Sequence, residues 1–246
     1  MKIIINGAGG RMGKEVVRLA EEGFGGASVA AKVDISYETN GDEYKKLADF
    51  SGAADCIIDF SHHSAAAEIT EYAVENNIPA VIASTGQTPE EIELIKAASK
   101  KVPIFLSANM SLGVALLVEL AKITAKNFPY ADIEIIEKHH NRKLDAPSGT
   151  ALLVAEAIKS VREKTKFVFG RHGQAKRTPE EIGIHAVRMG NIIGEHEVIV
   201  GTDTQTITLK HEAHSRALFA EGAIKAAAFL QGKPAGLYNM ESMIND

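Results

Sequence analysis

The pattern of apolar and polar residues divides the chain into two regions. In residues 1–108, short apolar runs alternate with stretches that have helical spacing. Strands that recur with helices between them are typical of a parallel sheet with helices on both faces. The pattern predicts strands over residues 1–6, 28–34, 55–60, 80–83 and 104–106, and helices over residues 11–22, 64–76 and 89–100.

After Ser111 the pattern changes. Closely spaced strands with turn signals indicate a meander of mostly antiparallel strands. A last helix has a small-residue face that suits packing on the first sheet. The predicted helices cover residues 112–127, 149–163 and 217–230, and the predicted strands cover 133–137, 182–188, 197–200 and 205–211, with turns at 190–194 and 201–203.

The predicted fold is therefore α/β, with a Rossmann-type doubly wound parallel sheet and a second α+β domain that has a mixed, largely antiparallel sheet. We expect residues 1–108 and 217–246 to form a dinucleotide-binding domain. Residues 109–216 are expected to form a substrate-binding and oligomerisation domain. The strands after Ile182 are apolar, and a sheet face without helix cover usually packs against another subunit.

Composition and charge exclude several classes of protein. The 45% hydrophobic and 24% charged residues are ordinary for a globular chain, so a disordered or fibrous protein is excluded. We expect no membrane span, because no apolar run reaches the roughly 18–20 residues that a span needs. The net charge of −5 argues against nucleic acid as the main partner. A single cysteine cannot form an internal disulfide, which favours a cytoplasmic protein.

A glycine-rich segment follows the first predicted strand and begins the first predicted helix. Glycines allow a tight turn and a close approach to a pyrophosphate, and the helix N-terminus offers N–H groups to it. The fit to the G-x-G-x-x-G fingerprint is imperfect, because Met12 stands at the third glycine position and Gly13 follows it. The segment, a predicted dinucleotide site, is Gly7-Ala8-Gly9-Gly10-Arg11-Met12-Gly13.

Asp34 ends the second predicted strand, where an acidic side chain meets the adenosine ribose hydroxyls. An aspartate there repels a 2′-phosphate, so we expect NADH to be favoured. NADPH is not excluded, because Arg11 and Lys32 are nearby cations. Two later loops also follow strands of this sheet, and ligands bind at the carboxyl ends of such strands. These candidates for the remaining cofactor contacts are Ala83, Ser84 and Thr85, and Ala108, Asn109, Met110 and Ser111.

The densest polar cluster covers residues 137–151, from a predicted strand to a predicted helix. It holds His139, His140, three cations and a Ser-Gly-Thr at the helix start. A positive loop beside a helix N-terminus binds carboxylates, and a histidine suits proton delivery because its pKa lies near neutral pH. The alternative interpretation is a solvated basic loop in which Ser148 caps the helix.

Three other features carry weaker signals. The pair His62-His63 lacks lysine neighbours, so we expect it to be structural or peripheral to the cofactor. Cys56 lies in an apolar strand, which favours a core position over a catalytic thiol. The nine histidines lack the H-E-x-x-H spacing, and one cysteine cannot form a thiolate cluster, so no metal site is expected.

With these residues in hand, the chain resembles the 4-hydroxy-tetrahydrodipicolinate reductase (dihydrodipicolinate reductase) family of bacterial and plant lysine biosynthesis. The displaced glycine of the first motif is usual in that family. One departure is Ile35, because some members carry an arginine directly after the acid of strand 2. The resemblance rests on the glycine-rich segment, Asp34, Ser84-Thr85-Gly86, residues 107–111 and 137–151, Arg188-Met189-Gly190, residues 194–197, His211, Ser215 and Arg216.

The resemblance implies that NADH or NADPH reduces 4-hydroxy-tetrahydrodipicolinate to tetrahydrodipicolinate with loss of water, in the diaminopimelate route to lysine. It implies that His139 is the acid–base group and Lys143 a second proton donor. It also implies a homotetramer. The alternatives are another two-domain NAD(P)-dependent dehydrogenase and a dinucleotide-sensing regulator. The residues expected to hold the dicarboxylate substrate are His140, Lys143, Ser148, Gly149 and Thr150.

Overall fold

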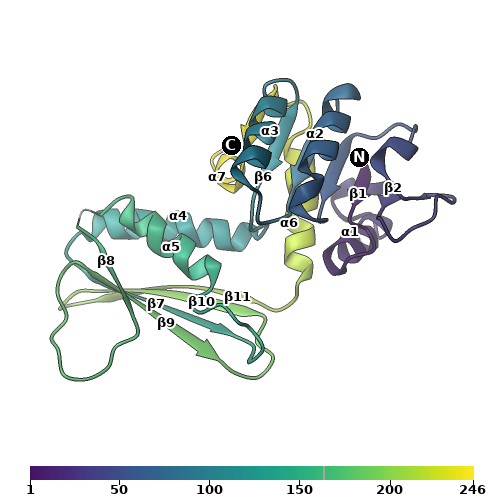
Figure 1. The fold of residues 1–246 in the computed structure, drawn as a ribbon. Coiled ribbons are helices and arrows are strands. Elements are labelled where there is room, and N and C mark those ends of the chain that lie inside the picture. Colours follow the sequence, from purple (N-terminus) through teal and green to yellow (C-terminus); the bar gives the residue numbers. More distant parts are fainter. Residues whose placement is uncertain (163) are drawn as a thin grey trace. The chain divides into compact units, whose positions relative to one another are not determined.

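The computed structural model describes residues 1–162 and 164–246, which form two compact units (Figure 1). The first unit consists of Met1–Leu112 and Arg216–Asp246, and the second is Gly113–Ser215. The second unit is therefore an insertion into the first. Within the described residues, no helix is both long enough and apolar enough to span a membrane.

The first unit is built on a seven-stranded parallel sheet with the order β12-β6-β5-β4-β1-β2-β3. The chain proceeds outward from β1 in both directions, which is the strand-order reversal of a doubly wound fold and confirms the predicted Rossmann-type sheet. The edge strands β3 and β12 were not predicted, because two or three residues carry no periodic signal. The strands are β1 (Lys2–Asn6), β2 (Ser28–Val33), β3 (Glu43–Tyr44), β4 (Cys56–Asp59), β5 (Ala80–Ile82), β6 (Pro103–Leu106) and β12 (Gly236–Tyr238).

Helices cover both faces of this sheet, because its central strands are apolar on both sides. On one face, Ile4 and Ile57 pack with Ile69 of α2 and Ile95 of α3. On the other, α6 packs on α1, β4 and β5, and Phe105 of β6 lies edge-on to a phenylalanine of α6. The helices are α1 (Arg11–Glu21), α2 (Ala66–Glu75), α3 (Pro89–Ser99), α6 (Ala217–Phe229) and α7 (Met240–Ile244), with short 3₁₀ turns at Phe24–Gly26, Leu47–Asp49 and His63–Ala65.

The second unit contains a five-stranded mixed sheet with the order β11-β10-β7-β9-β8, as predicted for its class. The predicted meander holds for the β10–β11 hairpin, whereas β9 joins β7 in parallel. This pairing places Ile182 beside Ile133 in one core, a contact that strand spacing does not reveal. The strands are β7 (Asp132–His139), β8 (Lys166–Phe169), β9 (Glu181–Arg188), β10 (Gly194–Gly201) and β11 (Thr206–Ala213), and the helices are α4 (Leu112–Asn127) and α5 (Gly149–Lys159).

Both helices lie over one face of this sheet (Figure 1). Alternate residues of β7 point toward them: Ile133 and Ile135 in the core, and then Glu137 and His139. Strand β7 therefore continues through His139, two residues beyond its predicted end. Helix α5 ends at Lys159, earlier than predicted, and the predicted end at residue 163 lies outside the described residues.

Candidate active site

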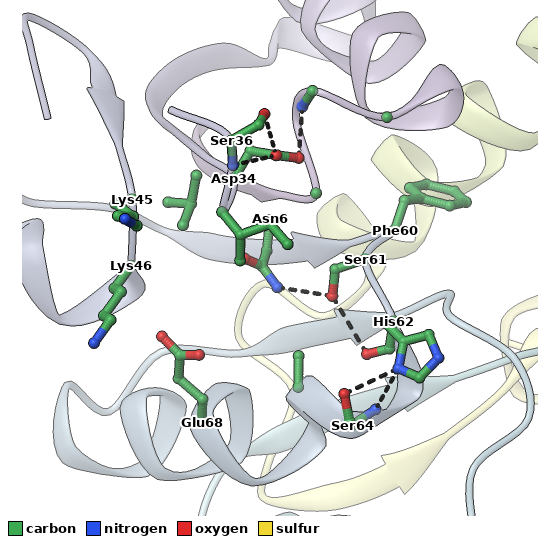
Figure 2. A pocket seen from close by; sticks show the side chains of 16 residues that line it. Asn6, Asp34, Ser36, Lys45, Lys46, Phe60, Ser61, His62, Ser64 and Glu68 are labelled. Atoms are coloured by element: carbon green, nitrogen blue, oxygen red, sulfur yellow. Dashed lines mark hydrogen bonds between the residues drawn. The ribbon is translucent and has the colours of Figure 1, made fainter. Parts of the chain in front are cut away.

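A cavity of about 730 Å³ lies at the carboxyl ends of β1, β2 and β4 in the first unit (Figure 2). This edge, where the strand order reverses, is where open α/β sheets bind their ligands. Four of the residues predicted to bind the cofactor line the cavity, namely Gly7, Gly9, Gly10 and Asp34.

The glycine-rich segment is shaped by close backbone contacts. Gly7 has φ of +79°, and a Cβ there would lie 2.7 Å from the Ser61 nitrogen. A Cβ on Gly13 would lie 2.0 Å from the carbonyl oxygen of Gly7, so Gly13 allows α1 to pack against the loop. The displaced glycine thus has the close-packing role of the third fingerprint position, one residue later.

The Asp34 carboxylate is fixed beside this loop. Its Oδ2 accepts a hydrogen bond from the Gly9 N–H at 3.0 Å, and its Oδ1 accepts from the Ser36 N–H and hydroxyl at 3.0 and 2.6 Å. Burial opposes ionisation of Asp34, but these hydrogen bonds outweigh it and hold its pKa below the ordinary value. A Cβ on Gly9 would lie 2.9 Å from the Asp34 Cγ, so glycine keeps room for this contact.

The other predicted cofactor residues lie outside the lining of this cavity. Ala8 is buried, while Arg11 and Met12 form the first turn of α1. Ala83, Ser84 and Thr85 follow β5, where the Ser84 hydroxyl donates to Asp59 at 2.8 Å. Asp59 belongs to no sequence motif, yet this buried carboxylate also accepts hydrogen bonds from Asn6 and Ser61 and so connects the ends of β1, β4 and β5. Burial raises the pKa of Asp59.

The last predicted cofactor segment, residues 108–111, follows β6. The Asn109 side chain accepts a hydrogen bond from the Ser111 N–H at 2.9 Å, and Ala108 and Met110 lie in the same loop. Helix α6 packs closely here, since a Cβ on Gly222 would lie 1.7 Å from the Met110 carbonyl oxygen. The C-terminal helix therefore supports this loop.

In the second unit, His139 lies at the end of β7 beside a buried carboxylate. Its Nδ1 is 2.6 Å from Glu137 Oε2, and both side chains are buried. Arg188 on β9 donates to both Glu137 oxygens at 2.8 and 2.7 Å, and the Ser148 N–H donates at 3.0 Å. Burial opposes ionisation, but the bonds from Arg188, His139 and Ser148 hold the pKa of Glu137 below its ordinary value.

A second histidine, His196 on β10, completes the cluster. Its Nε2 lies 3.0 Å from the Ser148 hydroxyl, and its ring is edge-on to His139 with centroids 5.2 Å apart. Burial, and then the nearby His139, lower the pKa of His196 to about 4, so it is neutral at pH 7. A Cβ on Gly194 would lie 3.1 Å from His139 Nε2, so the glycine leaves space at that atom.

The three cations of the predicted basic loop have different surroundings. Lys138 points to the opposite face of the sheet and pairs with Glu195 at 2.9 Å, so it does not belong to the cluster. Arg142 donates to Asn191 at 2.6 Å. Lys143 pairs with the exposed Asp145 at 2.8 Å, and this hydrogen bond lowers the pKa of Asp145.

The polar residues on either side of Lys143 lie in a turn and at the start of α5. The His140 N–H donates to Ile192 at 2.7 Å, and its carbonyl accepts from the Lys143 N–H. Ser148 caps α5 by accepting from the Ala151 N–H at 3.2 Å, so the capping interpretation of Ser148 is confirmed. Gly149 and Thr150 are the first residues of α5, and a Cβ on Gly149 would meet nothing within 4 Å.

The weaker signals also have definite places. His62 lines the cavity, whereas His63 pairs with Glu91 at 2.9 Å. Cys56 is fully buried in β4, as predicted, and burial raises the pKa of its thiol. Within the described residues, no group of three or more His, Cys, Asp or Glu side chains could hold a metal ion.

Comparison with known proteins identifies the family. The model for the N-terminus of dihydrodipicolinate reductase matches residues 1–110, and that for its C-terminus matches residues 113–244. The chain belongs to the dihydrodipicolinate reductase family. This family consists of NAD(P)H-dependent oxidoreductases. Membership confirms the predicted resemblance over both alternatives, another two-domain dehydrogenase and a dinucleotide-sensing regulator.

Individual relatives agree with this assignment. The 4-hydroxy-tetrahydrodipicolinate reductase of Caldanaerobacter subterraneus is 47% identical over 99% of this chain and 98% of its own. That of Clostridium tetani is 44% identical over 100% of this chain and 97% of its own. A dipicolinate-bound dihydrodipicolinate reductase from Paenisporosarcina superposes with a TM-score of 0.81, at 26% identity over 97% of both chains. The relatives therefore span both units of this member of the dihydrodipicolinate reductase family.

Proposed function

We propose that this chain reduces 4-hydroxy-tetrahydrodipicolinate to tetrahydrodipicolinate, with oxidation of a reduced nicotinamide dinucleotide and release of water. The observation that carries the proposal is the buried Glu137–His139 pair, held by Arg188 beside Lys143 and the start of α5. The family and its dipicolinate-bound member support a six-membered ring dicarboxylate as the class of substrate.

The first unit fits the dinucleotide, which would supply the hydride. The three glycines bring the backbone close to the cavity, and the ionised Asp34 suits a ribose diol. We assign Ala8, Arg11 and Met12 to the phosphates because they begin α1, whose N-terminus favours anions. The loops after β5 and β6 are assigned to the nicotinamide half. Asp34 favours NADH, since a carboxylate repels a 2′-phosphate.

The second unit supplies the proton chemistry. Glu137 accepts from Nδ1 of His139, which leaves Nε2 as the atom that exchanges protons with substrate. Reduction of a conjugated imine builds negative charge on the ring, and a proton from His139 neutralises it. Arg188 keeps Glu137 ionised, so a carboxylate faces Nδ1 of His139 and orients its ring.

Lys143 is proposed to serve both as a second proton donor and as a carboxylate ligand. Its present partner Asp145 is exposed, so a substrate carboxylate can take its place. The groups proposed to hold the rest of the substrate are His140, Ser148, Gly149 and Thr150, which lie in the turns around Lys143 and at the positive end of α5.

A coupled assay tests the function. Pyruvate and aspartate semialdehyde are supplied to the upstream synthase, and loss of nicotinamide absorbance is followed with NADH and with NADPH. Consumption that depends on both the synthase and this chain is expected. No consumption with either nucleotide would refute the proposal.

We also propose that the chain assembles into a homotetramer through the second unit. The sheet face opposite α4 and α5 carries an ion-pair network, in which Glu134 contacts His185, Arg171 and Arg177. The apolar strands after Ile182 predicted an apolar sheet face, but this face is polar. We therefore expect it to join subunits through polar contacts. Light scattering should give about four times the 26.4 kDa chain mass, and a monomer mass would refute the assembly. The single cysteine also supports a cytoplasmic location.

A further inference from the structure

Two lysines that belong to no sequence motif, Lys45 and Lys46, line the same cavity as Asp34. Figure 2 shows Lys45 and Lys46 with Asp34 among the residues that line it. Strand β3 pairs in parallel with β2, with Val33 opposite Tyr44, and the Asp34 N–H donates to the Tyr44 carbonyl at 3.0 Å. Lys45 is therefore the neighbour of Asp34 at the carboxyl edge of the sheet.

The cations considered from sequence are placed elsewhere. The Lys32 ammonium lies 3.2 Å from Glu21 and 3.1 Å from Asp42, and these acids raise its pKa. Neither Lys32 nor Arg11 lines the cavity. The charge of Lys14 in α1 helps to lower the pKa of Asp34, but Lys14 does not line the cavity either. The lysines that do line it, Lys45 and Lys46, directly follow β3, a strand too short to be recognised by its pattern.

The charge balance of the cavity depends on these lysines. Its charged lining residues are Asp34, Lys45, Lys46 and Glu68, so the two cations offset the two carboxylates. Glu68 accepts a hydrogen bond from the Leu47 N–H at 3.2 Å, which fixes it on the side of the cavity near Lys46 (Figure 2). Without the lysines, the charged side chains that line the cavity would be the two carboxylates, Asp34 and Glu68.

We propose that Lys45 and Lys46 form a binding site for the 2′-phosphate of NADPH, so that the chain accepts both nucleotides. This inference rests on the proposed function only in taking a nicotinamide dinucleotide as the ligand. A 2′-phosphate carries close to two negative charges at pH 7 and would lie beside the ribose position that Asp34 marks. Lysine suits such a site because its ammonium is a compact charge on a flexible stem. The two lysines would thereby take the place of the arginine that some members of the family carry at the position of Ile35.

The test compares the affinity of the purified full chain for each nucleotide, followed by the intrinsic fluorescence of the reduced nicotinamide. The double variant Lys45→Gln/Lys46→Gln should raise the Kd for NADPH roughly 10- to 100-fold, as expected when two charge-assisted contacts are lost. The Kd for NADH should stay within about threefold, because neither lysine contacts the ribose diol in this proposal. Lys45→Arg/Lys46→Arg should keep most of the NADPH affinity.

Lys100→Gln/Lys101→Gln is the matched control, since it removes two adjacent exposed lysines of the same unit from outside the cavity. It should leave both affinities unchanged. Equal loss of NADH and NADPH binding in the Lys45/Lys46 variant, or no loss of either, would overturn the lysine site. Wild-type chain that binds NADH and not NADPH would overturn the lysine site alone. Wild-type chain that binds neither would overturn the proposed function as well.

Discussion

The Glu137 carboxylate offers a sharp test of how His139 is positioned. It is fully buried, and four donors from His139, Arg188 and Ser148 converge on its two oxygens. Glu137→Gln keeps the shape but replaces one oxygen by an NH₂ group that meets donors, and it leaves the Arg188 charge without its partner. Breaking a buried ion pair in this way costs about 3–5 kcal/mol, so the free energy of unfolding should fall by that amount.

The same change should lower kcat by roughly 10²-fold or more, because His139 loses the carboxylate that orients its ring for proton transfer. Urea unfolding measures the first effect, and the coupled assay measures the second. The loss of stability in acid should also change, since the depressed pKa of Glu137 keeps it ionised in the fold. Its stabilising contribution is present above the unfolded pKa of about 4.3 and is lost as the pH falls through the folded value.

Glu134→Gln is the matched control for this experiment. Glu134 lies on the same strand and pairs with His185 at 2.7 Å, but both side chains are partly exposed and lie on the opposite face of the sheet. Its loss removes partly exposed contacts with His185, Arg171 and Arg177 on the face proposed to join subunits, so it should cost less stability than Glu137→Gln and leave the kcat of the assembled chain within a few-fold of wild type. A folded Glu137→Gln variant with near-normal kcat, or an equal loss in Glu134→Gln, would refute the role assigned to Glu137.

Four further outcomes are expected. His139→Gln should lower kcat by roughly 10²-fold while NADH affinity barely changes, and His62→Gln should do much less in the same assay. Lys143→Ala should cut kcat/KM at least as strongly, because a charge-assisted contact contributes about 1.5–3 kcal/mol. Asp34→Ala should raise the KM for NADH more than that for NADPH. Because the folded pKa of His196 is depressed to about 4, stability should fall by about 2 kcal/mol from pH 6.5 to pH 5, and His196→Gln should flatten this loss in urea titrations.

Each expectation has a result that contradicts it. A loss in His62→Gln equal to that in His139→Gln would mean that the wrong histidine pair was assigned. Near-normal kcat/KM in Lys143→Ala would instead support the interpretation of residues 137–151 as a solvated basic loop. An unchanged KM for NADH in Asp34→Ala would show that Asp34 does not meet the ribose. If the stability of His196→Gln and of wild type depended on pH in the same way, protonation of another group would cause the loss of stability.

The sequence predicted the two regions of the fold and most of their helices and strands, because these depend on the local pattern of apolar and polar residues. It placed the end of β7 at Glu137, since a strand signal based on apolar alternation stops where the alternating residues become polar. The same spacing of two between Glu137 and His139 was the available sign that both side chains share a face.

Partners from distant strands could not be predicted in this way. Arg188 reaches Glu137 because β9 pairs with β7 in parallel, and His196 reaches Ser148 because β10 pairs with β7 on the other side. The order of residues along the chain does not reveal the register of either strand pair. Lys45 could not be predicted for a related reason. Strand β3 is only two residues long, and only its pairing with β2 places Lys45 next to Asp34.

The insertion of the second unit has a consequence for how the chain is made. Met1–Leu112 leaves the ribosome first. The elements that complete this unit belong to Arg216–Asp246: helix α6 covers β4 and β5, and strand β12 pairs with β6. The nascent first unit therefore exposes an apolar sheet face and an open edge strand while all of Gly113–Ser215 is synthesised. The inserted unit has every strand of its sheet within its own stretch of chain. The unit that begins first is thus completed last, and its apolar sheet face and open edge strand stay uncovered longest during translation.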